Sequence, residues 1–437
     1  MNHITRRNIL QSGSGIAAAT AFTIIRPELV RGAGKEKLKA GLVGCGGRGT
    51  QAVIDMMRGT ENVEIVSMGD IFEDKLEASL ANMKKQPDAD KFIDRIKVDA
   101  EHRFVGFDAY KKVLASDIDY VMLATPPGYR PMHFEAAVEA KKHVFCEKPF
   151  GVDPVGVKRF MAAAKKSEEL KLTVMSGAQR RNDKGYMETV DKIHNGALGD
   201  VLATYAYWVG TPVFPIKTKQ DRKPDWGEMA WQHRQWYSFV WICGDQIVEQ
   251  HLHNIDVCNW VMGTHPVECV ASGGAAWRPK DDPEFYGNIF DHISSDFVYP
   301  NGVHMSSYCR QFPKGSAENV SELIIGSKGR SNGYDLSGAA QDPRTARRGD
   351  PRQGPYVREH TAMLASIRGD GPYVNHGMTV AETTMTCIMG REAAYSGQKI
   401  TWDMMMNSQL DLQPKQFDYD IKLDVAPLPV PGVYKFS

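Results

Sequence analysis

The stretch that decides the fold is LKAGLVGCGGRG, residues 38–49, close to the start of the chain. Its first six residues are mostly apolar and predict a buried strand, and GCGGRG then places Gly44, Gly46 and Gly49 in the spacing GxGxxG. The first glycine of such a turn allows a tight bend, the second lets the backbone approach a diphosphate, and the third packs helix on strand. A helical run to about Met57 follows, so the phosphates would face free N–H groups at a helix N-terminus.

A second strand-like run, VEIVSM at 63–68, ends just before Asp70, about 20 positions after the last glycine of the turn. A carboxylate at that place accepts hydrogen bonds from a ribose 2′-hydroxyl and repels a 2′-phosphate, which favours NAD over NADP. Arg48, inside the turn, is the opposing signal, because an arginine there can contact a phosphate. The alternative for Asp70 is a carboxylate that only caps the next helix.

Strands and helices alternate from residue 38 to about residue 150. After the second strand, the sequence predicts helices in the 70s and 80s, at 108–116 and at 133–142, and strands at 119–127 and 143–149. Such alternation predicts an α/β domain of Rossmann type, with a doubly wound parallel sheet.

Beyond about residue 160 the pattern changes to strand-like segments bounded by Gly or Pro, with fewer helices. These segments are 201–209, 267–277, 292–300 and 303–312. We therefore expect a C-terminal α+β domain with a largely antiparallel open sheet. The expected divisions are an N-terminal segment at 1–34, a nucleotide-binding domain at 35–160, a substrate-binding domain at 161–407 and a Pro-rich tail at 408–437. The polar run 342–355 predicts a loop, and the tail is expected to wrap a neighbouring subunit in a homo-oligomer.

Composition excludes some classes of partner. The 437 residues contain 53 Lys and Arg and 53 Asp and Glu, and no long run of one sign, so neither nucleic acid nor an anionic membrane surface is expected. A small neutral or weakly charged ligand fits this balance better. The seven cysteines are widely spaced and form no CxxC pair, which argues against a disulfide framework and a structural zinc site. Most are expected to be buried as small apolar side chains.

The N-terminus carries TRRNILQ at 5–11, followed by a mildly apolar, Gly- and Ala-rich stretch at 12–25 that is short for a membrane span. This pattern resembles a twin-arginine export signal, which predicts a periplasmic protein with no membrane span in its mature chain. Such signals resemble those of proteins exported already folded, often with a cofactor inside. The alternative is an arginine pair that happens to precede a disordered tail.

Three further motifs carry a resemblance to a known family: ATPP at 124–127, CEKP at 146–149 and HNGALGDV at 194–201. Together with the glycine turn, they make residues from about 38 to 405 resemble the family of glucose-fructose oxidoreductase and inositol dehydrogenase, usually called Gfo/Idh/MocA. The resemblance implies hydride transfer between NAD(P) and a hydroxyl-bearing carbon of a sugar or cyclitol. The residues then expected to bind the cofactor are Gly44, Cys45, Gly46, Gly47, Arg48, Gly49, Asp70, Thr125, Pro126, Glu147 and Lys148.

The same resemblance implies the catalytic residues. The family's EKP lysine lies close to nicotinamide ribose and substrate, so Lys148 inherits that role. A lysine in a dry pocket beside the positive nicotinamide ring should have a lowered pKa, suited to proton exchange near neutral pH. The family's second-domain pattern is an Asp followed four residues later by a His, and here Glu249 and His253 match it. His251 stands where many relatives have Gly, which puts the substrate geometry in doubt.

The segment GDQIVEQHLHNID at 244–256 is open to three interpretations. In a continuous helix, Glu249, His253 and Asp256 share one face, and Glu249 reaches His253 to form an acid/base pair. His251 then points away, so the segment lacks the geometry of a helical zinc site, and no metal is predicted. The third interpretation is a packed helix whose histidines only hydrogen-bond the core.

Other substrate contacts are expected from Gln179 and Arg180, which follow a strand at 172–178, and from Trp236 in the aromatic run 231–241. His251 and Asp256 complete this substrate-binding set. The alternatives are solvent-facing arginines and an aromatic lid or subunit contact.

An exported protein has no dissolved NAD to draw on, so a tightly bound cofactor must be regenerated on the enzyme. The first hypothesis is therefore a periplasmic NAD-dependent oxidoreductase acting on a sugar, cyclitol or glycoside. The second is a glycosidase that resembles glycoside hydrolase family 109, working by oxidation, elimination, hydration and re-reduction. The third is a cofactor-bound binding protein without turnover.

Overall fold

The computed structural model describes residues 37–337 and 354–437. The export-signal prediction and all but the last two residues of the loop predicted at 342–355 lie outside these ranges. Within them, no helix is both long enough and apolar enough to cross a membrane. All seven cysteines are buried and unpaired, which confirms their predicted burial.

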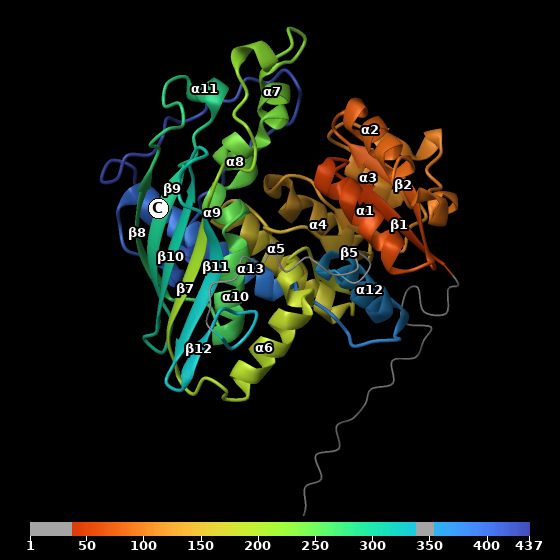
Figure 1. The fold of residues 1–437 in the computed structure, drawn as a ribbon. Helices are drawn as coiled ribbons and strands as arrows, with labels where there is room; N and C mark the ends of the chain where they lie inside the picture. Colours follow the sequence, from red (N-terminus) through yellow and green to blue (C-terminus); the bar gives the residue numbers. More distant parts are fainter. Residues whose placement is uncertain (1–36, 338–353) are drawn as a thin grey trace, which may run out of the picture.

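The first sheet is parallel and has the strand order β3-β2-β1-β4-β5-β6. Its strands are β1 (Leu38–Val43), β2 (Val63–Asp70), β3 (Arg103–Val105), β4 (Tyr120–Leu123), β5 (His143–Cys146) and β6 (Val174–Ser176). The helices between them are α1 (Gly47–Gly59), α2 (Glu73–Lys84), α3 (Ala109–Ala115), α4 (Arg130–Glu139) and α5 (Pro154–Glu169). This is the predicted doubly wound Rossmann sheet (Figure 1).

The N-terminal domain is completed by a later part of the chain. Helix α12 (Pro355–Arg368) packs against α1, and residues just after it cover the edge of β6, where Val174 N donates to Val374 O. The boundary expected at residue 160 falls inside α5, and the first sheet continues beyond it to β6.

The second sheet has the order β12-β11-β7-β10-β9-β8-β13 and is antiparallel except for the pair β7 and β10. Its strands are β7 (Val201–Gly210), β8 (Glu268–Gly274), β9 (His292–Val298), β10 (His304–Gln311), β11 (Asn319–Gly326), β12 (Gly329–Ser331) and β13 (Ile400–Thr401). Helices α9 (Gln246–Glu249), α10 (Leu252–Met262) and α13 (Gly377–Ser396) lie between this sheet and the N-terminal domain (Figure 1). The four strand segments predicted from the sequence are confirmed.

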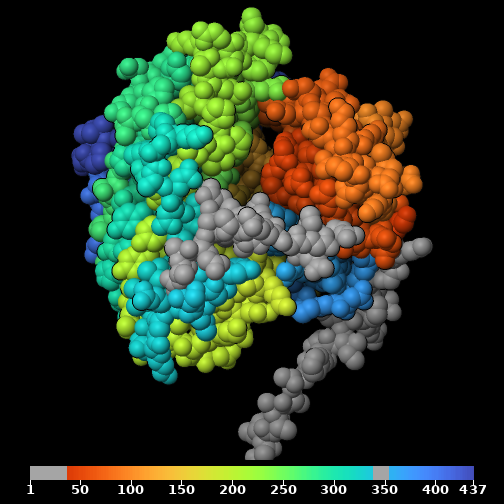
Figure 2. All heavy atoms as spheres, in the orientation of Figure 1, coloured from red at the N-terminus to blue at the C-terminus, as the bar shows by residue number. Residues whose placement is uncertain are grey.

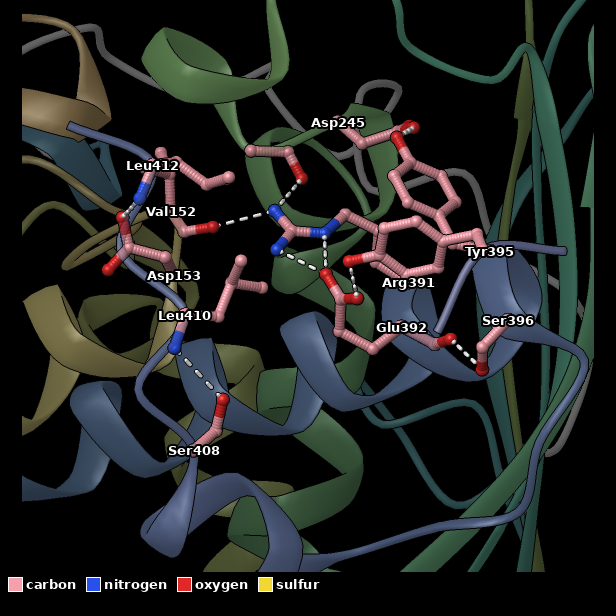
Figure 3. Close-up of polar contacts among 12 residues, drawn as sticks. Val152, Asp153, Asp245, Arg391, Glu392, Tyr395, Ser396, Ser408, Leu410 and Leu412 are labelled. Carbon is pink, nitrogen blue, oxygen red and sulfur yellow. Dashed lines mark hydrogen bonds and ion pairs between the residues drawn. The ribbon is translucent and has the colours of Figure 1, made fainter. Parts of the chain in front are cut away.

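The remaining helices are short or peripheral: α6 (Lys184–His194), α7 (Glu228–Arg234), α8 (Val240–Cys243), α11 (Pro283–Tyr286) and α14 (Trp402–Asn407). Helix α13 has almost no exposed surface, and it carries a buried ion pair between Arg391 and Glu392 whose guanidinium also donates to Val152 O (Figure 3). This helix joins the core beneath the second sheet to α5 of the N-terminal domain.

The C-terminal tail packs along its own chain. Leu412 N donates to Asp153 Oδ2 at 3.0 Å, as Figure 3 shows, and Phe417 stacks on Phe107 with ring centroids 5.8 Å apart. Further on, Tyr419 OH donates to Ile71 O. The tail therefore contacts both domains and reaches the N-terminal domain just after β2.

Candidate active site

A cavity of about 1150 Å³ lies between the two domains. Its walls combine the glycine turn after β1, the ends of β2, β4 and β5, and segments of the second domain around α7, α9 and α10. Figure 2 shows the molecule hollowed between the red and orange N-terminal domain and the green segment opposite it. The cavity therefore lies at the carboxyl edge of the parallel sheet, where open α/β sheets bind ligands.

The glycine turn has the conformation that its spacing predicts. Gly44 has φ +96°, and a Cβ on Gly49 would lie 1.9 Å from Gly44 O, so neither position accommodates a side chain. Gly46 and Gly47 line the cavity, and no atom lies within 4 Å of where a Cβ would stand on either. Helix α1 begins at Gly47, so its free N–H groups face this open space, which fits the diphosphate of a dinucleotide.

Asp70 lies at the end of β2 and lines the same cavity. Its carboxylate accepts from Cys45 N at 2.7 Å and from Phe72 N at 2.9 Å, which ties the glycine turn to the second strand. Burial raises the pKa of this carboxyl above its ordinary value. Arg234 of the second domain lies over the Phe72 ring at 3.7 Å and pairs with Asp74 at 2.7 Å, so it covers this end of the cavity.

Arg48 also lines the cavity, but its charge is already paired. Its guanidinium donates to three carboxylates: to Glu147 Oε1, to Asp55 Oδ2 at 3.3 Å and to Glu359 Oε1 at 3.0 Å. Burial raises the pKa of Glu359, which comes from α12 and is fully buried. A Cβ on Gly177 would lie 2.3 Å from Glu147 Oε2, so a glycine is needed to make room for this network.

Lys148 follows β5 at the carboxyl edge of the sheet and is 7% exposed. Its Nζ donates to the backbone carbonyl of Glu249 and to Glu249 Oε1 at 3.1 Å, which joins the two domains across the cavity wall. Thr125 and Pro126, at the end of β4, line the cavity on the same side. Of the residues that the family resemblance implies, all but Cys45 and Gly49 line this one cavity; Cys45 is buried beneath the turn, and Gly49 packs against Gly44 O.

The expected continuous helix over 244–256 is wrong. Helix α9 ends at Glu249, and α10 begins at Leu252. The carbonyl of Glu249 accepts from Lys148, while His253 N donates to Gln250 O at 3.3 Å. The expected hydrogen bond between the Glu249 carboxylate and His253 is replaced by bonds to Lys148 and to Gln250 Nε2.

The break separates the three polar residues that were expected on one face. His253 lines the cavity and stacks on Trp208 with ring centroids 5.9 Å apart. Asp256 is buried away from the cavity and forms a two-point ion pair with Arg181, with both distances 2.8 Å. The structure therefore does not bring Asp256 together with the other residues predicted to bind substrate.

His251 belongs to the core of the second domain. Its Nε2 is 2.8 Å from the Ser307 hydroxyl on β10, its side chain is fully buried, and burial lowers its pKa to about 3. The structure therefore does not bring His251 to the cavity with the other residues predicted to bind substrate. Because the helix is broken, the phase argument used above against a metal site does not apply. The described parts of the chain nevertheless contain no group of three or more His, Cys, Asp or Glu side chains arranged to hold a metal ion.

The other predicted substrate residues, Gln179, Arg180 and Trp236, line the cavity. Arg180 is buried in an ion pair with Glu322 and donates to His253 O at 3.1 Å, so it positions the backbone of that histidine. Tyr237, within the predicted aromatic run 231–241, also lines the cavity. Trp208 and Arg278 line it too but were not predicted, because they come from a separate strand and loop and no motif marks them.

Comparisons with known proteins agree with this site. Residues 38–176 match the model of the Gfo/Idh/MocA oxidoreductase family with an NAD-binding Rossmann fold. Inositol 2-dehydrogenase of Salmonella typhimurium is 26% identical over 226 residues, which cover 52% of this chain and 54% of that protein. An uncharacterized oxidoreductase, YrbE of Bacillus subtilis, is 26% identical over 164 residues, which cover 38% of this chain and 41% of that protein. The chain thus spans about half the length of the curated relatives it matches.

Solved structures share the fold over more of the chain. The WlbA dehydrogenase of Bordetella pertussis, in complex with NADH and UDP-GlcNAcA, has a TM-score of 0.63 at 18% identity, covering 84% of this chain and 98% of that one. An aldose-aldose oxidoreductase of Caulobacter crescentus has a TM-score of 0.62 at 16% identity, covering 84% and 99%. With its glycine turn, its parallel sheet and the family match, the N-terminal domain of this chain is similar to the NAD-binding Rossmann domain of the Gfo/Idh/MocA oxidoreductase family over residues 38–176.

Proposed function

We propose that this protein is an NAD-dependent oxidoreductase that moves hydride between the bound cofactor and a hydroxyl-bearing carbon of a sugar or cyclitol. The observation that carries the proposal is the buried pair of Lys148 and Glu249, with Nζ and Oε1 3.1 Å apart, in the wall of the cavity that contains the glycine turn. The 26% identity to an inositol 2-dehydrogenase supports a polyhydroxylated substrate.

The residues around the cavity fit a dinucleotide. Gly46 and Gly47 leave room for the diphosphate, Asp70 offers a carboxylate to the adenosine ribose, and Thr125 lies on the path toward Lys148. Bound NAD supplies a hydride acceptor at its nicotinamide ring. We propose NAD rather than NADP, since Asp70 repels a 2′-phosphate and the arginine of the turn is already paired with carboxylates.

Lys148 is the group placed to exchange the proton. Two of its ammonium N–H bonds point at Glu249, which leaves the third position of the nitrogen facing a substrate hydroxyl. Lys148 can pass one proton to Glu249 Oε1 and become a neutral amine; when the carbon bearing the hydroxyl gives up hydride, the lone pair of that amine accepts the hydroxyl proton. Reduction of a ketone runs the same transfers in reverse.

His253 and the aromatic walls position the sugar ring. His253 faces the cavity while its backbone carbonyl is held by Arg180, and its ring is stacked on Trp208. Trp236 lines the cavity as well, and flat aromatic faces pack well against the C–H faces of a pyranose or cyclitol. His253 is the second side chain we assign to proton transfer.

The cofactor end of the cavity is covered, which supports tight retention of NAD. Arg234 bridges from the second domain to Asp74, and Tyr419 of the tail donates to Ile71 O beside Asp70. A retained cofactor must be reoxidised on the protein, which suits export to the periplasm by the twin-arginine route. It also suits the alternative of a net glycosidase that returns the hydride within one cycle.

The test is to express the full chain, locate it by fractionation, and release and quantify any NAD(H) that co-purifies. The protein is then incubated without added cofactor with a panel of sugars, cyclitols and aryl glycosides, while absorbance at the NADH band and the products are followed. A keto-sugar with reduced cofactor supports the oxidoreductase. Free aglycone without net oxidation supports the glycosidase, and no product with any substrate supports a binding protein.

Lys148→Met tests the assignment of the proton-transfer group. Turnover should fall about 10²- to 10⁴-fold, because general acid–base catalysis contributes on that scale, while bound NAD is retained. The matched control is Lys166→Met, in which an exposed lysine paired with Glu139 is lost. If Lys148→Met turns over as fast as this control, the proposed site is wrong.

A further inference from the structure

Arg278 is a buried cation in the wall of the cavity. It follows β8, is 6% exposed, and among the residues that the structure describes its side chain makes one hydrogen bond, from Nη2 to Ser238 Oγ at 2.9 Å. A guanidinium has five N–H donors, so most of its donor capacity is unused. Among the described residues, no carboxylate lies within ion-pair distance of it.

Several arginines inside the protein pair with carboxylates: Arg180 with Glu322, Arg181 with Asp256, and Arg391 with Glu392. Two other buried arginines have no ion pair but donate to backbone carbonyls, Arg95 to those of Thr60 and Met57 and Arg130 to that of Pro149. Burying a charge without strong acceptors is costly, and Arg278 donates only to a hydroxyl, so its place in the cavity wall requires a reason. Burial lowers its pKa from the ordinary value, although a guanidinium stays charged at neutral pH.

The nearest acidic groups are already engaged. Asp291 Oδ2 accepts the backbone N–H groups of residues 276–278, and Asp245 accepts from Tyr395 OH and from Phe290 N. Both carboxylates attract Arg278 electrostatically and so raise its pKa, but neither accepts a hydrogen bond from it. The unsatisfied face of the guanidinium is therefore left for a group inside the cavity.

The same compartment reaches the proposed reaction centre. Tyr237 is next to Ser238 in the chain and lines the cavity. Burial raises the pKa of Tyr237, and the charge of Glu249 raises it further, so the Tyr237 ring lies within electrostatic range of Glu249, the residue that pairs with Lys148. Lys217, half-buried in the same wall, has no ion pair within the described chain. A ligand that spans these groups would place an anion at one end and a hydroxyl-bearing carbon at the other.

We propose that Arg278, oriented by Ser238 and assisted by Lys217, forms an anion-binding subsite, and that the substrate is an acidic sugar bearing a carboxylate or a sulfate. The planar fork of a guanidinium matches the two oxygens of such a group, and the bond is charge-assisted at both ends. The inference rests on the proposed oxidoreductase function and names the class of its substrate. It replaces the neutral or weakly charged ligand that the overall composition favours.

The experiment uses the NAD-loaded full chain with glucuronate, glucose 6-sulfate and glucose as probes. Binding is followed by tryptophan fluorescence, and hydride transfer by NADH absorbance. The wild type should bind an acidic sugar at least about 10-fold more tightly than glucose. Arg278→Gln should weaken the binding of acidic sugars about 10- to 100-fold and leave the binding of glucose unchanged. Arg278→Lys should restore sulfate binding better than carboxylate binding, because an ammonium lacks the planar fork.

The matched control is Arg310→Gln, which replaces a half-buried arginine of β10 that lies outside the cavity wall and whose guanidinium donates to Ala317 O. If thermal unfolding shows that Arg278→Gln does not fold, Ser238→Ala provides the comparison, because it removes the group that orients the guanidinium. Equal affinity of the wild type for glucose and both acidic sugars would overturn the subsite. So would an Arg278→Gln protein that binds acidic sugars as well as the control, or one that loses affinity for NAD instead.

The two proposals fail in distinguishable ways. Acidic sugars that bind through Arg278 but never reduce the cofactor would refute the oxidoreductase and leave the anion subsite in place. Oxidation of glucose with no effect of Arg278→Gln on any probe would leave the oxidoreductase in place and refute the subsite.

Discussion

Replacing Arg48 with methionine tests the ionic network beneath the glycine turn. The side chain is similar in length, but Glu147, Asp55 and Glu359 lose their shared cation, and their side chains are only 4%, 10% and 0% exposed. Removing one partner of a buried charge pair typically costs about 3–5 kcal/mol, and here three carboxylates are left facing one another. We expect the free energy of unfolding to fall by about that amount at pH 8.

The loss should depend on pH. Burial already raises the pKa values of Asp55 and Glu359 in the folded protein, and without the cation they rise further above the ordinary values of 3.8 and 4.5 that apply when the protein is unfolded. At pH values between the ordinary and the raised pKa, the folded protein binds more protons than the unfolded protein. The free energy of unfolding therefore falls as pH rises, by about 1.4 kcal/mol per pH unit for each extra proton. Arg48→Met should therefore be less destabilising at pH 5.5 than at pH 8.

The assay is urea unfolding of the NAD-free protein, followed by circular dichroism and tryptophan fluorescence at both pH values. Arg58→Met is the matched control, because Arg58 lies on the same helix and pairs with Asp88 near the surface, where such pairs contribute at most about 1 kcal/mol. Adding Glu359→Gln to Arg48→Met should recover part of the loss. If Arg48→Met costs no more than the control at either pH, the network is not what stabilises this turn.

Three further outcomes are expected. Gly49→Ala should lower the melting temperature of the NAD-free protein, because its Cβ meets Gly44 O, whereas Gly46→Ala should leave that temperature unchanged and weaken NAD binding in a titration. Asp70→Ala should raise activity with NADP relative to NAD in steady-state assays; an unchanged ratio would contradict the ribose contact. His251 is neutral when folded (pKa about 3) and titrates at 6.5 when unfolded, so the unfolded state binds more protons between these values and stability falls on acidification. His251→Asn should flatten the measured dependence of unfolding free energy on pH by up to about 1.4 kcal/mol per pH unit in that range.

The nucleotide half of the site was predictable because its causes are local. A tight turn, a close approach of backbone to ligand and the start of a helix each require glycine at a fixed offset, so the residues 44–49 and Asp70 could be placed from the sequence alone. The second sheet was predictable for a similar reason, since its strands alternate buried and exposed positions between Gly and Pro.

The segment 244–256 was not predictable, because a distant residue decides its conformation. The carbonyl of Glu249 would accept from His253 N in a continuous helix, but Lys148, 101 positions earlier, takes that place. Asp256 and His251 likewise find partners on other elements, in Arg181 and Ser307. Helical periodicity contains no information about such partners, and a buried polar residue goes wherever its hydrogen bonds can be satisfied.

The charged groups show the same limit. Arg48 gave a signal in the sequence, but the partner Glu359 lies 311 positions away and follows no motif. Arg278 sits in an ordinary polar loop, and only its burial in the cavity wall with a single hydroxyl as acceptor singles it out.

The return of α12 to the N-terminal domain bears on how the chain folds. The hydroxyls of Thr173, just before β6, and of Ser366, on α12, are 2.9 Å apart in space and 193 positions apart in sequence. Contacts of such long range form late, because the chain between them must first be brought together. During synthesis, the edge of β6 stays uncovered until the second sheet has been made as far as β12, and an uncovered edge can pair with other strands. This edge is therefore where a chaperone would protect the growing chain and where truncation would cause aggregation.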